Sequence, residues 1–189
     1  MALLGVLVGK GATSVDSWFQ QLGATMGAHR EDLLVVTYPP LVALVLVAVL
    51  VVTIRRRDWP STAMLMVCPA LAIGLVQLLK RVFGREKGGA LAYPSGHTTF
   101  LIVVLALAVV VVGVAGWSLA LATVLGVLGA FGQAVTYHYF TDTIGAALLA
   151  TSLVALAAQL TGYASRGRRE IAVPPRPSLN LDGSAPIDG

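Results

Sequence analysis

Five long stretches of this 189-residue chain consist almost wholly of apolar residues. A helix needs about 20 mostly apolar residues to cross the hydrocarbon core of a bilayer, and each stretch meets or nearly meets that length. The stretches occupy residues 33–54, 60–80, 97–115, 118–137 and 143–162. This pattern predicts an all-α protein, a polytopic membrane helix bundle with about five transmembrane helices.

Composition agrees with a membrane protein, since 57% of the residues are hydrophobic and only 12% are charged. A soluble domain is usually about 45–50% apolar and about 25% charged. The net charge is +4, and most Lys and Arg residues stand at the ends of the apolar stretches. Aromatic residues are not interleaved with them, so we expect contact with membrane lipids and no nucleic-acid partner.

The segments outside the apolar stretches differ in character. Residues 1–32 are expected to form an N-terminal interfacial amphipathic segment, with a helix in residues 13–31. Apolar side chains there form one stripe along a helix: Val15, Trp18, Phe19, Leu22 and Met26. Residues 33–165 form the transmembrane domain. Residues 166–189 are basic and rich in Pro and Gly, which predicts a disordered tail.

Arginine clusters suggest an orientation in the cell membrane. Residues 55–57 and the cluster Arg166, Arg168 and Arg169 fall on the same side of a five-span bundle. The positive-inside rule makes that side the cytoplasm. We therefore expect a multi-pass plasma-membrane protein with a cytoplasmic C-terminal tail.

Polar residues interrupt the apolar pattern at three places. Lys80 ends the second stretch and is followed by Arg85 and Lys87, residues 93–97 open the third, and residues 138–142 join the fourth to the fifth. Ionisable groups near membrane spans are costly and usually mark function. Antiparallel threading brings all three places to one face of the membrane, which the arginine clusters predict to be the exterior face.

Several of these residues suit an anion. Lys80, Arg85 and Lys87 are cationic donors, and Ser95 and Gly96 stand at the start of a predicted helix. Helix N-termini favour anions because their N–H groups are unpaired, and glycine lets the backbone approach an oxyanion closely. We expect these residues to bind the phosphate of a substrate.

The two histidines supply chemistry. His138 and Asp142 are four positions apart and would share one face of a helix. A carboxylate hydrogen-bonded to one ring nitrogen fixes the tautomer and leaves the other nitrogen free to act as a nucleophile. His97 is then the expected general acid for the leaving group.

Other interpretations of these residues exist. Lys80 alone is typical of a snorkelling lysine, and a single Pro-Ser-Gly is a common helix start. His97, His138 and Asp142 are also residue types that bind metals, but no Cys or Glu stands nearby, so we expect neither a metal nor another cofactor. The polar loops of a purely structural membrane subunit are a further alternative.

Taken in order, these residues resemble the PAP2 family of lipid phosphatases, whose motifs are K-x6-R-P, P-S-G-H and S-R-x5-H-x3-D. Lys80 matches the first motif, with Lys87 and Gly88 at the places of its arginine and proline. Residues 94–97 match the second motif fully, and His138 and Asp142 match the third. The resemblance covers about 63 residues of the chain, from Lys80 to Asp142.

The resemblance implies a metal-independent phosphatase acting on a lipid phosphate or diphosphate. His138 would form a phosphohistidine, Asp142 would orient it and His97 would be the general acid. A bacterial prenyl phosphate or diphosphate of the cell envelope and phosphatidic acid are the implied substrates.

One departure from the family pattern affects function. The third motif's serine and arginine should fall at Phe131 and Gly132, where neither is present. Losing one charged contact to a transition state costs about a hundred- to a thousandfold in rate. The alternative is therefore a catalytically weak or inactive relative that binds or carries a lipid phosphate.

Overall fold

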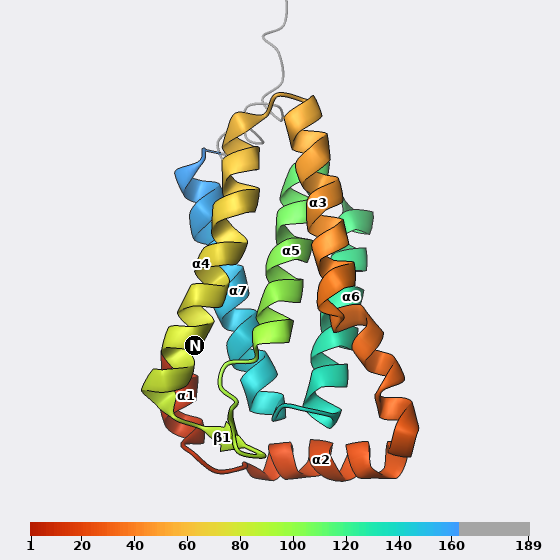
Figure 1. Cartoon of the computed structure of the whole chain (residues 1–189), viewed down its shortest axis with the longest axis vertical. Helices are drawn as coiled ribbons and strands as arrows, with labels where there is room; N and C mark the ends of the chain where they lie inside the picture. The colour runs from red at the N-terminus through yellow and green to blue at the C-terminus, as the bar shows by residue number, and fades with distance from the viewer. Residues whose placement is uncertain (163–189) are drawn as a thin grey trace, which may run out of the picture.

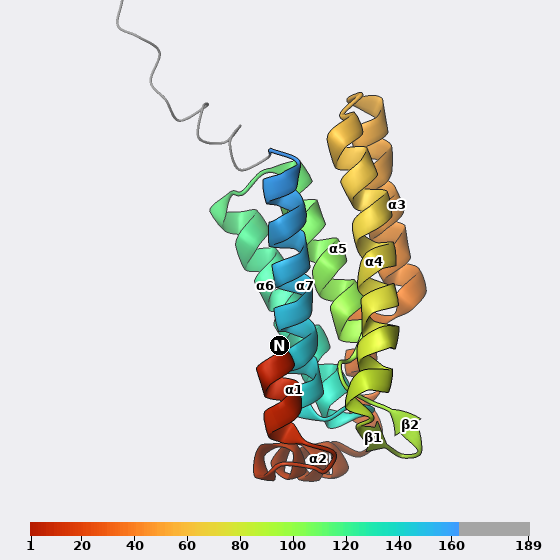
Figure 2. The same cartoon turned by 90° about the vertical axis from the view of Figure 1, so that its left-hand side faces the viewer.

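The computed structural model describes residues 1–162 of the chain, so the predicted C-terminal tail, residues 166–189, lies outside the described part. The described part is an all-α bundle, which confirms the predicted fold class. Figure 1 shows the long helices running side by side, and Figure 2 shows α5, α6 and α7 grouped on one side with α3 and α4 on the other. These helices are α3 (Pro39–Arg55), α4 (Trp59–Phe83), α5 (Gly96–Val112), α6 (Gly116–Val135) and α7 (Phe140–Leu160).

Four helical segments are long and apolar enough to cross a membrane: Asp32–Arg55, Trp59–Phe83, Gly116–Val135 and Phe140–Leu160. The third predicted span, 97–115, is shorter than expected, because α5 has 17 residues and ends before Gly113, whose φ of 114° does not continue a helix. A helix of that length extends about 25 Å, slightly less than the hydrocarbon thickness of about 30 Å.

The central position of α5 explains why it is apolar on all sides. It packs against α3, α4, α6 and α7. The main core cluster joins α4, α5 and α7 through side chains that are almost fully buried, among them Leu65, Ala72, Val103, Leu107 and Ala150. Small residues such as alanine let membrane helices approach closely, which favours this packing.

The N-terminal segment forms two helices, α1 (Ala2–Val8) and α2 (Ser14–Met26). The α1 helix packs beside α7 (Figure 2), and the Tyr93 hydroxyl donates a hydrogen bond of 2.8 Å to the Met1 carbonyl. The α2 helix lies across the end of the bundle (Figure 1). Two short 3₁₀ helices, η1 (Gly27–Arg30) and η2 (Asp32–Thr37), lead from α2 into α3.

Packing against α6 and α7 holds α2 in place. A Cβ atom added to Gly23 would lie only 2.0 Å from the Val135 carbonyl oxygen, so the two backbones touch here. Phe19 stacks on Phe140 with ring centroids 4.2 Å apart. The predicted apolar stripe is therefore divided, because Phe19 faces the bundle while Val15 and Trp18 are exposed. That α2 lies in a membrane interface stays a prediction.

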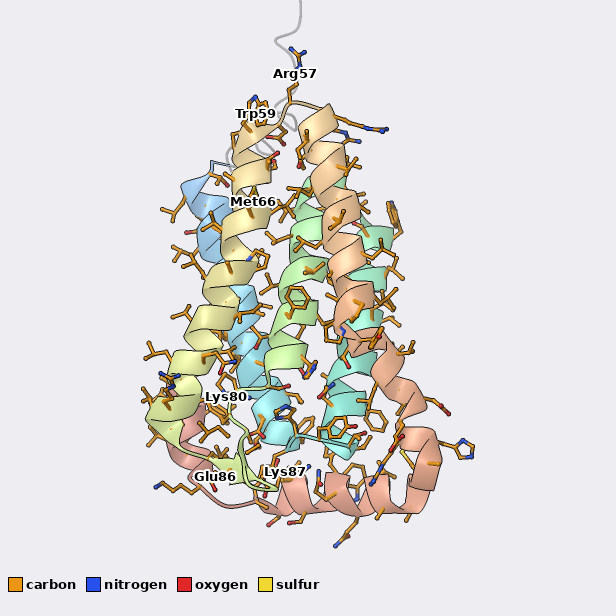
Figure 3. All side chains as sticks on the ribbon, viewed as in Figure 1. Arg57, Trp59, Met66, Lys80, Glu86 and Lys87 are labelled. Atoms are coloured by element: carbon orange, nitrogen blue, oxygen red, sulfur yellow. The ribbon has the colours of Figure 1, made fainter. Side chains whose placement is uncertain are left out.

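A short hairpin connects α4 to α5 at the same end of the bundle as α2. Its strands are β1 (Glu86–Lys87) and β2 (Ala90–Leu91). Figure 3 shows Lys80 and Lys87 at this end, with Arg57 at the opposite end. The end of the bundle covered by α2 and the hairpin therefore carries the residues expected to bind an anion.

Candidate functional site

A cavity of about 440 Å³ lies between the end of α4, the hairpin and the end of α6. Three of the predicted site residues line this cavity: Lys80, Lys87 and His138. The other lining residues come from the hairpin and from the turn that precedes α7. The cavity therefore brings two cations and an imidazole together at one end of the bundle.

His138 and Asp142 face each other, although not on one helix as expected. His138 lies in the turn before α7, and Asp142 is in the first turn of α7, where it accepts a hydrogen bond of 3.0 Å from the Tyr139 backbone N–H. The His138 Nδ1 atom is 3.7 Å from Asp142 Oδ2 and has no hydrogen-bond partner. Catalytic hydrogen bonds are often this long before substrate binds. With Nδ1 directed at the carboxylate, Nε2 is the nitrogen available to a substrate.

Arg85 is buried and does not face the cavity, in contrast to the phosphate-binding role expected from the sequence. Its Nη1 atom donates hydrogen bonds of 2.8 Å to Asp142 Oδ1 and 2.6 Å to the Thr141 hydroxyl. Its Nη2 atom donates to Asp16 Oδ2 at 2.7 Å and to the Gly11 carbonyl at 2.8 Å. Both terminal nitrogens are occupied, so Arg85 orients Asp142.

Asp16 is a site residue that the sequence analysis missed. It comes from α2, is fully buried, and accepts hydrogen bonds from Arg85 and from the Thr141 backbone N–H. Burial raises its pKa, but the hydrogen bonds from Thr141, Thr13 and Arg85 outweigh burial and hold the pKa below its usual value. The spacing Thr13-x-x-Asp16, a helix capping box, was the one signal in the sequence, and it indicates only a helix start.

Lys87 reaches the cavity from the hairpin. Its Nζ atom donates a hydrogen bond of 2.9 Å to the His138 carbonyl and lies 5.1 Å from the centre of the Tyr139 ring. An ammonium group has three donors, so two remain for a ligand. Burial lowers the Lys87 pKa to about 8, although Asp142 and Asp16 oppose that shift.

Lys80 is the less constrained of the two lysines. It ends α4 and is partly buried. Its ammonium group makes no hydrogen bond or ion pair with any residue of the described chain, and Asp142 attracts it only from a distance. A cation held at a cavity without a carboxylate partner favours binding of an anion.

The start of α5 presents His97 beside this site. His97 is exposed and is not among the residues that line the cavity, but it lies near enough to Lys80 to interact with it electrostatically. Ser95 is fully buried instead, and its hydroxyl accepts hydrogen bonds from the Thr98 N–H and hydroxyl. The Ser95 N–H donates to the Asp142 carbonyl at 3.2 Å. These bonds make Ser95 a helix cap and leave the N–H groups of Gly96 and His97 for an anion.

The two positions that depart from the family motif are filled by packing. A Cβ atom on Gly132 would lie 2.9 Å from the Leu33 carbonyl oxygen, so η2 occupies the space that a side chain would need. Phe131 packs edge-on against Phe19 of α2, with ring centroids 6.0 Å apart. The adjacent Gln133 turns away from the cavity and donates to the buried Thr37 hydroxyl at 2.8 Å. No cation reaches the cavity from these three positions of α6.

The charges around the cavity do not balance. The carboxylates of Asp16 and Asp142 are both paired with Arg85, which leaves Lys80 and Lys87 without an ion-pair partner among residues 1–162. No group of three or more His, Cys, Asp and Glu residues arranged to hold a metal ion occurs in the same part of the chain. The arrangement therefore suits an anionic ligand next to a histidine whose Nδ1 atom faces a carboxylate.

Comparisons with protein-family models, with curated proteins and with solved structures found no match to this chain.

Proposed function

We propose that this protein is an integral membrane phosphatase that removes phosphate from a lipid phosphate or diphosphate. The observation that carries the proposal is the cavity shared by Lys80, Lys87 and His138, with Asp142 behind the His138 ring. The cavity lies at one end of apolar helices long enough to cross a bilayer. A substrate whose tail lies in the bilayer presents its headgroup at that level.

The proposed reaction assigns a role to each of these side chains. The lone pair of His138 Nε2 attacks phosphorus, the bond from phosphorus to the lipid oxygen breaks, and His97 gives its proton to that oxygen. Asp142 stabilises the ring as it becomes positive. Lys80, Lys87 and the Gly96 N–H hold the phosphoryl oxygens. Water, activated by the deprotonated His97, then hydrolyses the phosphohistidine and releases inorganic phosphate.

Prenyl phosphates, prenyl diphosphates and phosphatidic acid are the substrates that fit this proposal. Arg55–Arg57 lie at the end of the bundle opposite the cavity (Figure 3 shows Arg57). Under the positive-inside rule we infer that the site faces the exterior of the plasma membrane, where bacterial cell-envelope lipids carry their headgroups. The protein then needs no metal or other cofactor.

The test is release of inorganic phosphate by the purified protein in detergent. Prenyl diphosphate and phosphatidic acid are offered with a metal chelator present, and His138→Ala is compared with the natural chain. His29→Ala is the matched control, since this histidine is exposed and pairs only with Asp32. Release by the natural chain and by His29→Ala, with none by His138→Ala, is expected. Release that persists in His138→Ala overturns the assigned nucleophile.

A second candidate function is a non-catalytic protein that binds or carries a lipid phosphate. The close packing of Leu33 on Gly132 favours it, because no cation from that position of α6 can grip the phosphate. Binding of lipid phosphate without turnover of any substrate would support this function over the enzyme.

A further inference from the structure

Arg30 lies next to the cavity, although it belongs to none of the sequence motifs. It ends η1, the short helix that follows α2. Its backbone carbonyl accepts a hydrogen bond of 3.5 Å from the Thr136 hydroxyl, and Thr136 lines the cavity. The turn carrying Arg30 is thereby fixed to the segment that also carries His138.

The guanidinium of Arg30 has no partner of its own. Its Nε atom is buried without a hydrogen bond, and no carboxylate in the described part of the chain pairs with it. Its positive charge acts on Lys87, whose ammonium group it disfavours. Arg30 and Lys87 therefore repel each other, and neither forms an ion pair with a carboxylate among residues 1–162. An anion bound by both cations would relieve this repulsion.

The same N-terminal segment also fills the place on α6 from which a cation could otherwise reach the phosphate. Leu33 of η2 rests on Gly132, so the end of α6 has no room for a long side chain. Leu33 follows Arg30 by three positions, and both belong to the turns between α2 and α3. The segment that packs against Gly132 of α6 therefore also carries Arg30.

We propose that Arg30 binds the phosphate group of the ligand in this cavity, together with Lys80 and Lys87. This inference rests on the proposed function for the identity of the ligand. An arginine presents a planar fork of donors that matches two phosphate oxygens, whereas each lysine acts as a point charge. Arg30 is then the one bidentate contact among the three cations.

Kinetics of phosphate release test the assignment. Arg30→Gln is expected to lower kcat/KM about ten- to a hundredfold, the usual range for a lost charged hydrogen bond. Arg30→Lys restores only part of the loss, because the charge returns without the fork. Lys10→Gln is the control, an exposed cation of the same N-terminal segment that takes no part in the site. Equal kcat/KM in Arg30→Gln and Lys10→Gln would overturn the proposal.

Binding measured without chemistry separates this inference from the proposed function. The His138→Ala protein is placed in nanodiscs of neutral phosphatidylcholine, and binding of phosphatidic acid and of inorganic phosphate is measured with and without Arg30→Gln. Weaker binding of either probe in Arg30→Gln supports Arg30 as a phosphate-binding residue. Which probe binds more weakly shows whether the site takes a lipid headgroup or free phosphate. Unchanged binding of both refutes it. A natural chain that binds but releases no phosphate refutes only the enzymatic function.

Discussion

Asp16 and Arg85 form a fully buried ion pair, with 2.7 Å between Oδ2 and Nη2, that ties the N-terminal helix to the site. The other terminal nitrogen of Arg85 bonds to Asp142, the carboxylate that faces His138. Buried charges are tolerated in proteins when they are paired and hydrogen-bonded. The carboxylates of Asp16 and Asp142 and both terminal nitrogens of Arg85 meet that condition. The position of Asp142 therefore depends on a helix that precedes it by more than a hundred residues.

Asp16→Asn should weaken both the fold and the reaction. Removing one partner of a buried pair costs about 3–5 kcal/mol. We expect a smaller loss of about 1–3 kcal/mol in the free energy of unfolding, because Asp142 still neutralises Arg85. Phosphate release should also fall, since Arg85 is then held from one side only.

Thermal unfolding in detergent, together with the phosphate assay, measures both effects. Asp32→Asn is the control, because the Asp32 side chain is exposed and pairs only with the exposed His29. An Asp16→Asn protein as stable and active as Asp32→Asn would show that the buried pair orients nothing.

Gly132→Ala should destabilise the protein although it adds a single methyl group. The new Cβ would lie 2.9 Å from a backbone oxygen of Leu33, and such overpacking costs about 1–3 kcal/mol. Gly126→Ala on the same helix is the matched control, since its nearest neighbour is 3.9 Å away. Unfolding midpoints that shift equally in the two variants would contradict the close packing of η2 on α6.

The affinity for phosphate should fall as the pH rises through about 8, the pKa of Lys87. Below that pH the ammonium group is charged and attracts the phosphate, and above it the neutral amine does not. A phosphate monoester is already a dianion above pH 7, so its own titration does not contribute. We expect KM to rise by up to about tenfold for each pH unit above 8, as one proton is lost.

Lys87→Arg provides the control for this pH effect. Arginine stays charged throughout the range, so its KM should remain flat between pH 7 and 9. An unchanged rise of KM in Lys87→Arg would assign the titration to a different group.

His97→Gln should slow hydrolysis according to the leaving group. General acid catalysis contributes about 10²–10⁴-fold when an alkoxide must be protonated. Alkyl and prenyl phosphates should lose that factor, whereas p-nitrophenyl phosphate should lose far less because its phenolate leaves without a proton. Equal losses for both kinds of substrate would exclude a proton transfer from His97. The unfolding midpoint should not move, since His97 is exposed.

Hydropathy was sufficient to predict the helical bundle, because an apolar stretch of about 20 residues has few alternatives to a membrane helix. The exception was α5. Its apolar pattern continues past Val112, but the helix ends there because the backbone of Gly113 is not helical. Antiparallel threading of these helices also predicted that Lys80 and His138 would lie at one end, and the structure places both at the same cavity.

The roles of Asp16 and Arg85 could not be predicted from the sequence. A polar residue on an amphipathic helix is normally solvated, and only the docking of α2 across the bundle buries Asp16. A cation in a loop can equally bind a ligand or a carboxylate, and the choice for Arg85 depends on a contact 69 positions away. The sequence also gives no signal that Leu33 lies against Gly132 and fills the space that a side chain there would need.

The separation of Asp16 from Thr141 has a consequence for biosynthesis, since their hydrogen bonds join residues 125 positions apart. The partner of α2 is α7, which is the last helix of residues 1–162 to leave the ribosome and enter the membrane. Until α7 is in place, Asp16 cannot accept its hydrogen bond from Thr141, and Arg85 cannot pair with Asp142. The site proposed to act on a lipid phosphate is therefore assembled only after α7 has joined the bundle.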